Sequence, residues 1–283
     1  MMAEQPLQGK VAIVTGAASP IGLGHAMTEG LVRAGARVAL FDLNETWLEQ
    51  STAEMHSIGG DDCALPVRVN ITDPSDIERA VNQTISELGG LHILVNNAGI
   101  NQRSEGYTTS DQTNDFWKLT PEQWNRVVAA NLNGPFYMSR AVVGHMLNQG
   151  WGRIIGVTTS MDTMWRKHGT PYGPSKAGHE ALVAAMAQEL EGTGVTANVL
   201  VPGGATLTNM TAGNTAYNQE KMIKPEVMQA PVVWLSSEAS NDFTGQRIIS
   251  YYWDENLPIQ ERLEKASAPA AWQQLGRQAI HPN

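Results

Sequence analysis

Residues 11–24 have the sequence VAIVTGAASPIGLG, and this stretch decides the fold. It begins with a short apolar run, Val11–Thr15, which ends at Gly16, and a helical pattern follows over about residues 24–34. Glycines let the backbone turn sharply between the two elements. A buried strand that leads through such a turn into a helix predicts a phosphate site, because the helix amino terminus presents N–H groups and a partial positive charge.

The same alternation continues along the chain. Further strands are expected at about residues 37–41, 64–69, 91–95, 153–158, 195–201 and 246–250, and helices at about residues 74–88, 121–147 and 171–190. Short apolar runs that alternate with helical patterns imply βαβ crossovers. The sequence therefore predicts an α/β fold with a doubly wound parallel sheet and helices on both faces, whose ligands bind outside the carboxyl ends of the strands.

Two segments interrupt the alternation, and both follow strand ends. Residues 101–115 are polar, and they are either a solvated insertion or a loop over the site. Residues 206–229 lack a clear sheet element, and we expect them to form a substrate lid. We therefore expect a single domain over residues 1–252, and a C-terminal extension over residues 253–283 that packs on the surface or on a partner subunit.

Composition and charge exclude several classes of partner. The 283 residues carry a net charge of −9 and contain no block of Lys or Arg, which disfavours nucleic acid and membrane surfaces. Cys63 is the only cysteine, the first ten residues lack an apolar core, and no stretch stays apolar for the roughly 20 residues that a membrane span needs. We expect a cytoplasmic protein, and no cluster of residues has the ligand spacing of a metal site.

Asp42 ends the second predicted strand, 18 residues after Gly24. A carboxylate at this position can accept hydrogen bonds from the ribose hydroxyls of an adenosine, and it would repel a 2′-phosphate. Its neighbours Ile21 and Leu43 supply no compensating base. The pattern favours NAD(H) over NADP(H), and the alternative is a solvated acid at a strand end.

Tyr172 and Lys176 lie four residues apart, which places them on one face of a predicted helix. A tyrosine hydroxyl has a pKa of about 10 and is a poor base at neutral pH. A neighbouring ammonium, together with the positive nicotinamide ring, favours the phenolate and lowers that pKa, so the tyrosine can exchange a proton with an alcohol or a carbonyl. Tyr217 and Lys221 have the same spacing, but they lie in the irregular segment, and we interpret them as a coincidence on a loop.

Five motifs together resemble the short-chain dehydrogenase/reductase family over about residues 7–250. They are the loop around Gly16, Gly22 and Gly24, the turn Asn96-Asn97-Ala98-Gly99, Asn131, the segment Tyr172-Gly173-Pro174-Ser175-Lys176, and the turn Pro202-Gly203. The resemblance implies a Rossmann-type sheet of about seven parallel strands and an NAD(H)-dependent enzyme that interconverts an alcohol and a ketone. It also implies association as a homodimer or homotetramer.

The resemblance also assigns residues to the cofactor. The contacts it implies come from Gly16, Ser19, Pro20, Gly22, Leu23, Asp42, Leu43, Asn70, Ile71, Asn97, Ala98, Gly99, Tyr172, Lys176, Pro202 and Gly203. Among these, the Asn-Asn-Ala-Gly turn supports the sheet beside the adenosine, and the Pro-Gly turn borders the nicotinamide. The phosphate loop departs from the family pattern, because five residues, 17–21, separate the first glycine from the Gly-x-Gly pair where three are usual.

For catalysis the resemblance implies a proton path from Tyr172 through the ribose and Lys176 to a water held near Asn131. A serine or threonine at the end of the fifth strand would bond the substrate oxygen. Counting back 13 residues from Tyr172, the usual family gap, gives Thr159, while side-chain chemistry favours the adjacent Ser160. We prefer Thr159 and keep Ser160 as the alternative.

Apolar side chains near these positions indicate the substrate class. Met161, Met164 and Trp165 follow the hydroxyls, His168 lies just before Tyr172, and Met210 follows the Pro-Gly turn. They are either ordinary packing residues or a wall for a bulky or cyclic apolar alcohol or ketone. Two other classes of function stay open: a nucleotide-binding sensor or scaffold without turnover, and a lyase or epimerase that uses NAD without net redox change.

Overall fold

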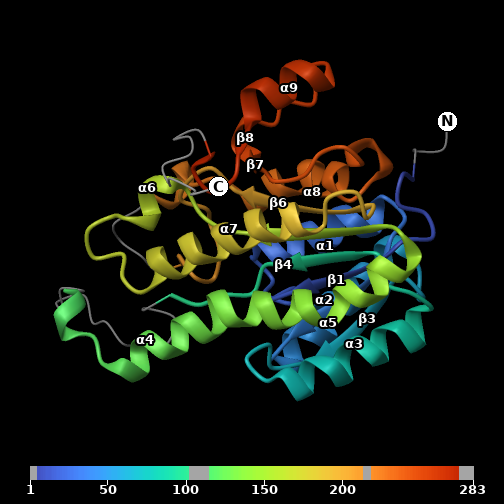
Figure 1. The fold of residues 1–283 in the computed structure, drawn as a ribbon. Helices are drawn as coiled ribbons and strands as arrows, with labels where there is room; N and C mark the ends of the chain where they lie inside the picture. The colour runs from blue at the N-terminus through green and yellow to red at the C-terminus, as the bar shows by residue number, and fades with distance from the viewer. Residues whose placement is uncertain (1–4, 102–114, 213–217, 274–283) are drawn as a thin grey trace, which may run out of the picture.

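The computed structural model describes residues 5–101, 115–212 and 218–273. Within them, one eight-stranded sheet has the order β3-β2-β1-β4-β5-β6-β7-β8 (Figure 1). The strands are β1 (Val11–Thr15), β2 (Arg37–Asp42), β3 (Ala64–Arg68), β4 (Ile93–Asn96), β5 (Gly152–Val157), β6 (Val195–Val201), β7 (Gln246–Ile249) and β8 (Ser267–Pro269). The first seven pair in parallel, and β8 is antiparallel to β7. The predicted doubly wound sheet is confirmed, with one strand more than the seven expected.

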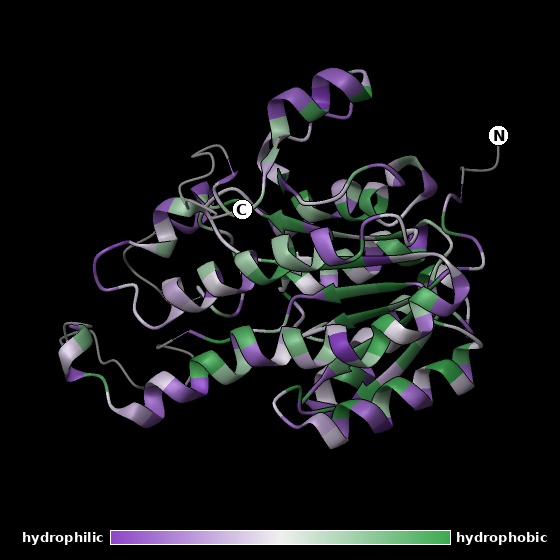
Figure 2. Cartoon of the chain, viewed as in Figure 1, coloured by the Kyte–Doolittle hydropathy of each residue, from purple (hydrophilic) through white to green (hydrophobic). Residues whose placement is uncertain are grey.

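Side chains of each strand alternate between two cores. In β1, Ala12 and Val14 belong to one core, and Val11 and Ile13 to the other. Helices α1, α2 and α8 pack on the first face, and α3, α5 and α7 on the second (Figures 1 and 2). The helices are α1 (Leu23–Arg33), α2 (Glu45–Gly59), α3 (Pro74–Leu88), α4 (Pro121–Val128), α5 (Gly134–Gln149), α6 (Met161–Met164), α7 (Tyr172–Glu189), α8 (Gln229–Leu235) and α9 (Ile259–Ala266).

The helix predicted over residues 121–147 is interrupted in its middle. A π-helical segment, η2 (Ala129–Asn133), lies between α4 and α5. Such wide turns are common at functional sites, because they turn a side chain away from the regular helical direction. Asn131 lies in this segment and is fully buried.

Residues 206–229 and the C-terminal extension contribute structure that the sequence did not predict. Thr206 and Ile223 form an isolated parallel bridge, with the short 3₁₀ turn η3 (Gln219–Lys221) before Ile223 and η4 (Pro225–Met228) after it. The C-terminal extension supplies β8, whose Ala268 pairs with Arg247, and α9 projects from the body of the molecule (Figure 1). The sheet therefore continues beyond residue 252, where the sequence analysis ended the domain.

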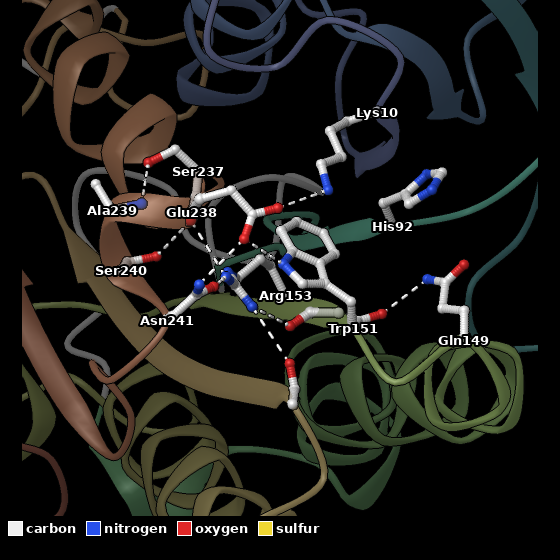
Figure 3. A network of polar contacts seen from close by, with 12 residues as sticks. Lys10, His92, Gln149, Trp151, Arg153, Ser237, Glu238, Ala239, Ser240 and Asn241 are labelled. Atoms are coloured by element: carbon white, nitrogen blue, oxygen red, sulfur yellow. Dashed lines mark hydrogen bonds and ion pairs between the residues drawn. The ribbon is translucent and has the colours of Figure 1, made fainter.

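A polar clasp holds the amino ends of β1 and β5 to the loop after α8 (Figure 3). Lys10 Nζ donates to Glu238 Oε1 at 3.0 Å, and Trp151 Nε1 and Asn241 Nδ2 donate to Glu238 Oε2, each at 3.1 Å. The Trp151 ring also lies between two cations, with Lys10 Nζ 3.6 Å and Arg153 Cζ 4.0 Å from its centroid. The hydrogen bond from Lys10 is the main reason that the pKa of Glu238 falls to about 2.

We expect Glu238→Gln to lower stability at neutral pH but not at acid pH. The folded-state pKa of Glu238 lies below its unfolded value, so its contribution is fully present above about pH 4.5 and is lost as the pH falls toward 2. The side chain is more than half exposed, and solvent screening limits the effect to about 1 kcal/mol. The difference between the thermal midpoints of the two proteins should be largest at pH 7 and should shrink steadily as the pH falls from about 4.5 toward 2; a difference that does not change with pH would contradict this account.

Candidate active site at the carboxyl edge of the sheet

Two loops meet where the strand order reverses between β1 and β4. Thr15 Oγ1 accepts hydrogen bonds from the backbone N–H groups of Asn97 and Ala98, each at 3.0 Å. Asn97 Nδ2 donates to the carbonyls of Thr15 at 2.9 Å and Gly16 at 3.1 Å. These bonds fix the Asn-Asn-Ala-Gly turn against the glycine-rich loop, in the crevice where sheets of this topology bind nucleotides.

The glycine-rich loop forms a cradle that side chains would fill. Gly16 has φ +64°, and a Cβ on Gly24 would lie 2.1 Å from the Gly16 carbonyl oxygen. Gly22 is the N-cap of α1, and within the described residues no side chain caps this helix end. The first N–H groups of α1 therefore remain for a ligand, and the loop fits the pyrophosphate of a dinucleotide.

The enlarged part of the loop contacts the segment after β6. Asn209 Nδ2 donates to Ser19 Oγ at 2.8 Å, and the Asn209 N–H donates to the Ile21 carbonyl at 3.2 Å. Pro20 lies on the exposed side of this loop. The additional residues thus bring the phosphate loop and the predicted lid together, a contact that the sequence analysis did not anticipate.

Asp42 ends β2 as predicted, and its carboxylate also organises its own turn. Oδ1 accepts from the N–H groups of Leu43 at 2.8 Å and Asn44 at 3.1 Å, and Oδ2 accepts from the Ala18 N–H at 3.1 Å. The last bond ties the end of β2 to the phosphate loop. Leu43 is largely exposed, and the carboxylate oxygens keep further lone pairs for ribose hydroxyls.

Two predicted adenine contacts lie after β3. Asn70 Oδ1 accepts from the N–H and the hydroxyl of Thr72, which leaves the Asn70 amide nitrogen as a donor. Ile71 lies against the start of α5, where a Cβ on Gly134 would come within 2.8 Å of its Cδ1.

The Pro202-Gly203 turn follows β6, and Gly203 packs so closely on Tyr251 that a Cβ on this glycine would lie 2.6 Å from the Cβ of the tyrosine.

Tyr172 and Lys176 lie one turn apart at the start of α7, below the carboxyl end of β5. Lys176 is buried, and its Nζ donates to the Val157 carbonyl at 2.8 Å. Burial lowers the pKa of Lys176 to about 8. Gly99 completes this corner, because a Cβ there would lie 2.9 Å from Asn131 Oδ1 and 3.3 Å from Lys176 Nζ.

In the protein without a nicotinamide, the pKa of Tyr172 is raised and not lowered. Burial is the main cause, and the Thr159 side chain and the charge of Arg166 oppose it. The Lys176 ammonium is directed to the Val157 carbonyl. A positive charge placed beside the phenol would favour the phenolate.

The structure separates the two candidate hydroxyls. The Thr159 side chain lies close enough to the Tyr172 hydroxyl to lower its pKa, against the effect of burial. Ser160 Oγ instead contacts Thr163 Oγ1 at 2.8 Å, at the start of the short helix α6. This geometry favours Thr159 as the partner of Tyr172, whereas alternation along the strand could not decide, because β5 ends at Val157.

Asn131 is held firmly by its neighbours. Its Oδ1 accepts from the Ile100 N–H at 2.8 Å, and its Nδ2 donates to the Ile100 carbonyl at 2.9 Å and to Ser175 Oγ at 3.0 Å. The side chain thus joins the end of the β4 turn to α7. Its place beside Lys176 follows from the π-helical segment, which the sequence did not reveal.

The candidate substrate residues differ in exposure. Met164 is buried, Met161 and Met210 are half-buried, and Trp165 and His168 are exposed. His168 has a φ of +63°, and its Nδ1 lies 3.6 Å from Asp115 Oδ1. The segments 102–114 and 213–217, which hold most of the polar insertion and Tyr217, lie outside the described residues.

Two further features concern the described part of the chain alone. It contains no group of three or more His, Cys, Asp or Glu side chains arranged to hold a metal ion. None of its helices combines the length and the apolar character that crossing a bilayer requires.

Comparisons with known proteins identify the family of this chain. The family model described as short chain dehydrogenase matches residues 10–219. The 3-oxoacyl-(acyl-carrier-protein) reductase FabG of Vibrio harveyi is 32% identical over 86% of this chain and 96% of its own length. The 2-dehydro-3-deoxy-L-rhamnonate dehydrogenase (NAD(+)) of a Sphingomonas species is 34% identical over 69% of this chain and 71% of its own.

A solved structure shows the same likeness in three dimensions. The 3-ketoacyl-(acyl-carrier-protein) reductase of Brucella melitensis, complexed with NADH, superimposes with a TM-score of 0.73 at 26% identity. The match covers 84% of this chain and 95% of that one. The family model, the sequence relatives and the shared architecture lead to one conclusion: the chain belongs to the short-chain dehydrogenase/reductase family and is an oxidoreductase that acts on CH–OH groups.

Proposed function

We propose that this enzyme interconverts a secondary alcohol and a ketone with NAD(H), and that Tyr172 is its general acid and base. The observation that carries the proposal is the place of Tyr172 at the carboxyl edge of β5, one helical turn from the buried Lys176 and beside Thr159, whose side chain lowers the Tyr172 pKa. Two neighbouring hydroxyls can bind the same substrate oxygen.

In the direction of ketone reduction, Thr159 donates a hydrogen bond to the carbonyl oxygen and Tyr172 transfers its proton to that oxygen. In the direction of oxidation, Tyr172 takes the proton from the alcohol. A bound nicotinamide supplies or accepts the hydride at the carbon, and its positive charge in the oxidised form favours the phenolate. Lys176 and Asn131, which converge near Gly99, would continue the proton path away from Tyr172.

The binding site for the dinucleotide is proposed along the same edge. The start of α1 and the loop with Gly16, Ser19, Pro20 and Gly22 would hold the pyrophosphate, with Leu23 as the first residue of the helix. Asp42 would bind the adenosine ribose, with Leu43, Asn70 and Ile71 beside the adenine. The turns Asn97-Ala98-Gly99 and Pro202-Gly203 would border the remaining part of the cofactor.

The substrate is proposed to be bulky or cyclic and apolar. Half-buried Met161 and Met210 would form its wall together with Trp165, which follows Met161 by one helical turn's length of chain, and residues 206–229 would act as a lid. Exposed Phe136 and Leu147 on α5 agree with a homo-oligomer, and a single buried cysteine, Cys63, agrees with a reducing compartment such as the cytoplasm. Both are proposals as well.

An absorbance assay tests the proposed reaction. The reduced-nicotinamide band should change when the protein is mixed with NAD(H) and cyclic or aromatic alcohols and ketones such as cyclohexanol, 1-phenylethanol and acetophenone. Turnover of small hydrophilic sugars or acids alone would contradict the substrate class. Binding of NADH without absorbance change with any substrate would favour a sensor or a redox-neutral enzyme.

Asp42 is expected to set the cofactor preference. The wild-type enzyme should use NAD with a higher kcat/KM than NADP, because the carboxylate repels a 2′-phosphate. Replacing Asp42 with Ser removes that charge. The ratio of kcat/KM with NAD to kcat/KM with NADP should then fall about tenfold, which corresponds to about 1.4 kcal/mol. The matched control is Asp62→Ser, an exposed acid in the turn before β3. An unchanged NAD-to-NADP ratio in Asp42→Ser would refute this role.

A further inference from the structure

Three consecutive residues at the end of β5, Val157–Thr159, are each held by a different charged side chain. Lys176 Nζ donates to the first carbonyl at 2.8 Å, as described above. The hydroxyl of the second residue, Thr158, donates to Glu180 Oε2 at 2.9 Å. Arg247 Nη2 donates to the third carbonyl, that of Thr159, at 3.0 Å.

Two of these charged groups form a buried ion pair. Arg247 Nη1 lies 3.2 Å from Glu180 Oε1, and the two residues are 4% and 1% exposed. Glu180 follows Lys176 by one turn of α7, and Arg247 lies on β7. Removing both charges from water costs free energy, and such a pair adds little net stability compared with apolar packing. We therefore look for its role in the geometry that it imposes on the neighbouring residues.

The residue whose position the pair affects is Thr159. The hydrogen bonds of the sheet do not fix Thr159, because β5 ends at Val157 and the next helix, α6, begins only at Met161. The bond from Arg247 fixes the peptide that follows Thr159, and the bond from Glu180 fixes the residue before it. The Thr159 side chain lies between these two points, and it lowers the pKa of Tyr172.

The C-terminal extension completes the arrangement. The N–H of Ala271, two residues after β8, donates to Glu180 Oε1 at 3.3 Å. Pairing of β8 with β7 brings this segment to the ion pair, because Ala268 lies opposite Arg247 itself. The extension thereby contacts Glu180, the residue that accepts the hydrogen bond of the Thr158 hydroxyl.

We propose that Arg247 and Glu180 are positioning residues that hold the Thr159 hydroxyl toward Tyr172. The proposal rests on the proposed function, in which that hydroxyl binds the substrate oxygen. It predicts that loss of the ion pair lowers kcat through Thr159 and leaves the binding of NADH nearly unchanged, because neither Arg247 nor Glu180 is among the proposed contacts of the cofactor.

The test is a double-mutant cycle on kcat with Arg247→Met and Thr159→Ala, assayed on the fastest alcohol of the panel. Arg247→Met alone should lower kcat about tenfold to a hundredfold, because displacement of a reacting group by about 1 Å has effects of this size. In the Thr159→Ala background the same substitution should have no further effect. Amide hydrogen exchange at residues 158–160 should rise in Arg247→Met, and the Kd for NADH, measured by fluorescence, should stay within about twofold of the wild type.

A paired variant keeps the test informative if Arg247→Met folds poorly. Replacing Glu180 and Arg247 together with Met removes both buried charges, so the thermal midpoint should recover while kcat stays low. The proposal would be overturned if the effects of Arg247→Met and Thr159→Ala on kcat multiplied in the double variant. It would also be overturned if kcat of the Glu180 and Arg247 double variant recovered together with its thermal midpoint. Full activity of Thr159→Ala would instead refute the role of Thr159 in the proposed function, which separates the two failures.

Discussion

Replacing Tyr172 with Phe is expected to lower kcat about a thousandfold, the middle of the range for loss of a general acid or base. The substitution removes a single oxygen and keeps the ring that packs at the start of α7. In ketone reduction the substrate oxygen then has no proton donor at this position, and Thr159 can offer it only a hydrogen bond. The measurement is kcat in both directions by absorbance of the reduced nicotinamide.

The control is Tyr252→Phe, an exposed tyrosine after β7, which should leave kcat within about twofold of the wild type. NADH should bind Tyr172→Phe with nearly normal affinity, because the hydroxyl contributes to proton transfer far more than to binding. A Tyr172→Phe enzyme that retained more than a tenth of the wild-type kcat would refute the assignment of the acid and base.

Replacing Lys176 with Met should lower kcat by about two orders of magnitude. Met preserves an apolar side chain of similar length at this buried position, so the decrease in kcat reports the contribution of the ammonium alone. Without it, the Val157 carbonyl loses its donor and the proton path near Asn131 loses its charged member. The variant should also bind NADH more weakly, since Lys176 is among the proposed contacts of the cofactor.

Two measurements separate chemistry from folding in this variant. Removal of a buried charge whose pKa is already lowered to about 8 should not reduce the thermal midpoint greatly, because the folded state already penalises the protonated form. Lys265→Met on α9 serves as the matched control, with kcat unchanged. If Lys176→Met kept its kcat and changed the midpoint only, the lysine would be a structural residue.

Much of the fold could be predicted from local signals. The run Val11–Thr15 and the run Val195–Val201 became strands with the expected bounds, since both lie in a sheet covered on its two faces. The helix at Glu45–Gly59 was not predicted, because its apolar stripe is weak and Asn44, its cap, reads as an ordinary loop residue. The strand β8 has only three residues, and pairing with β7 defines it more than its own composition does.

The site divides in the same way. Tyr172, Lys176 and Asp42 could be located by spacing, because one helical turn or one strand end fixes where they lie. The choice between Thr159 and Ser160 depended on backbone geometry beyond the last residue of β5. The pair Arg247 and Glu180 could not be predicted from the sequence, since the two residues lie more than 60 positions apart and come from different elements.

The direction of the Tyr172 pKa could not be predicted from spacing either. Lys176 follows Tyr172 by one turn of helix, but its ammonium is directed to a carbonyl of β5. Burial then dominates the pKa of the phenol and raises it. Spacing on a helix places two side chains on one face, and the neighbouring strand decides which atoms they contact.

The most direct test of the account is the crystal structure of the enzyme with oxidised dinucleotide and an unreactive substrate analogue. We expect the analogue oxygen about 2.6–3.2 Å from both Tyr172 Oη and Thr159 Oγ1, with the nicotinamide ring facing the carbon that bears it. An analogue oxygen bound by Ser160, or a Tyr172 ring directed away from the nicotinamide, would contradict the central claim that this phenol transfers the proton.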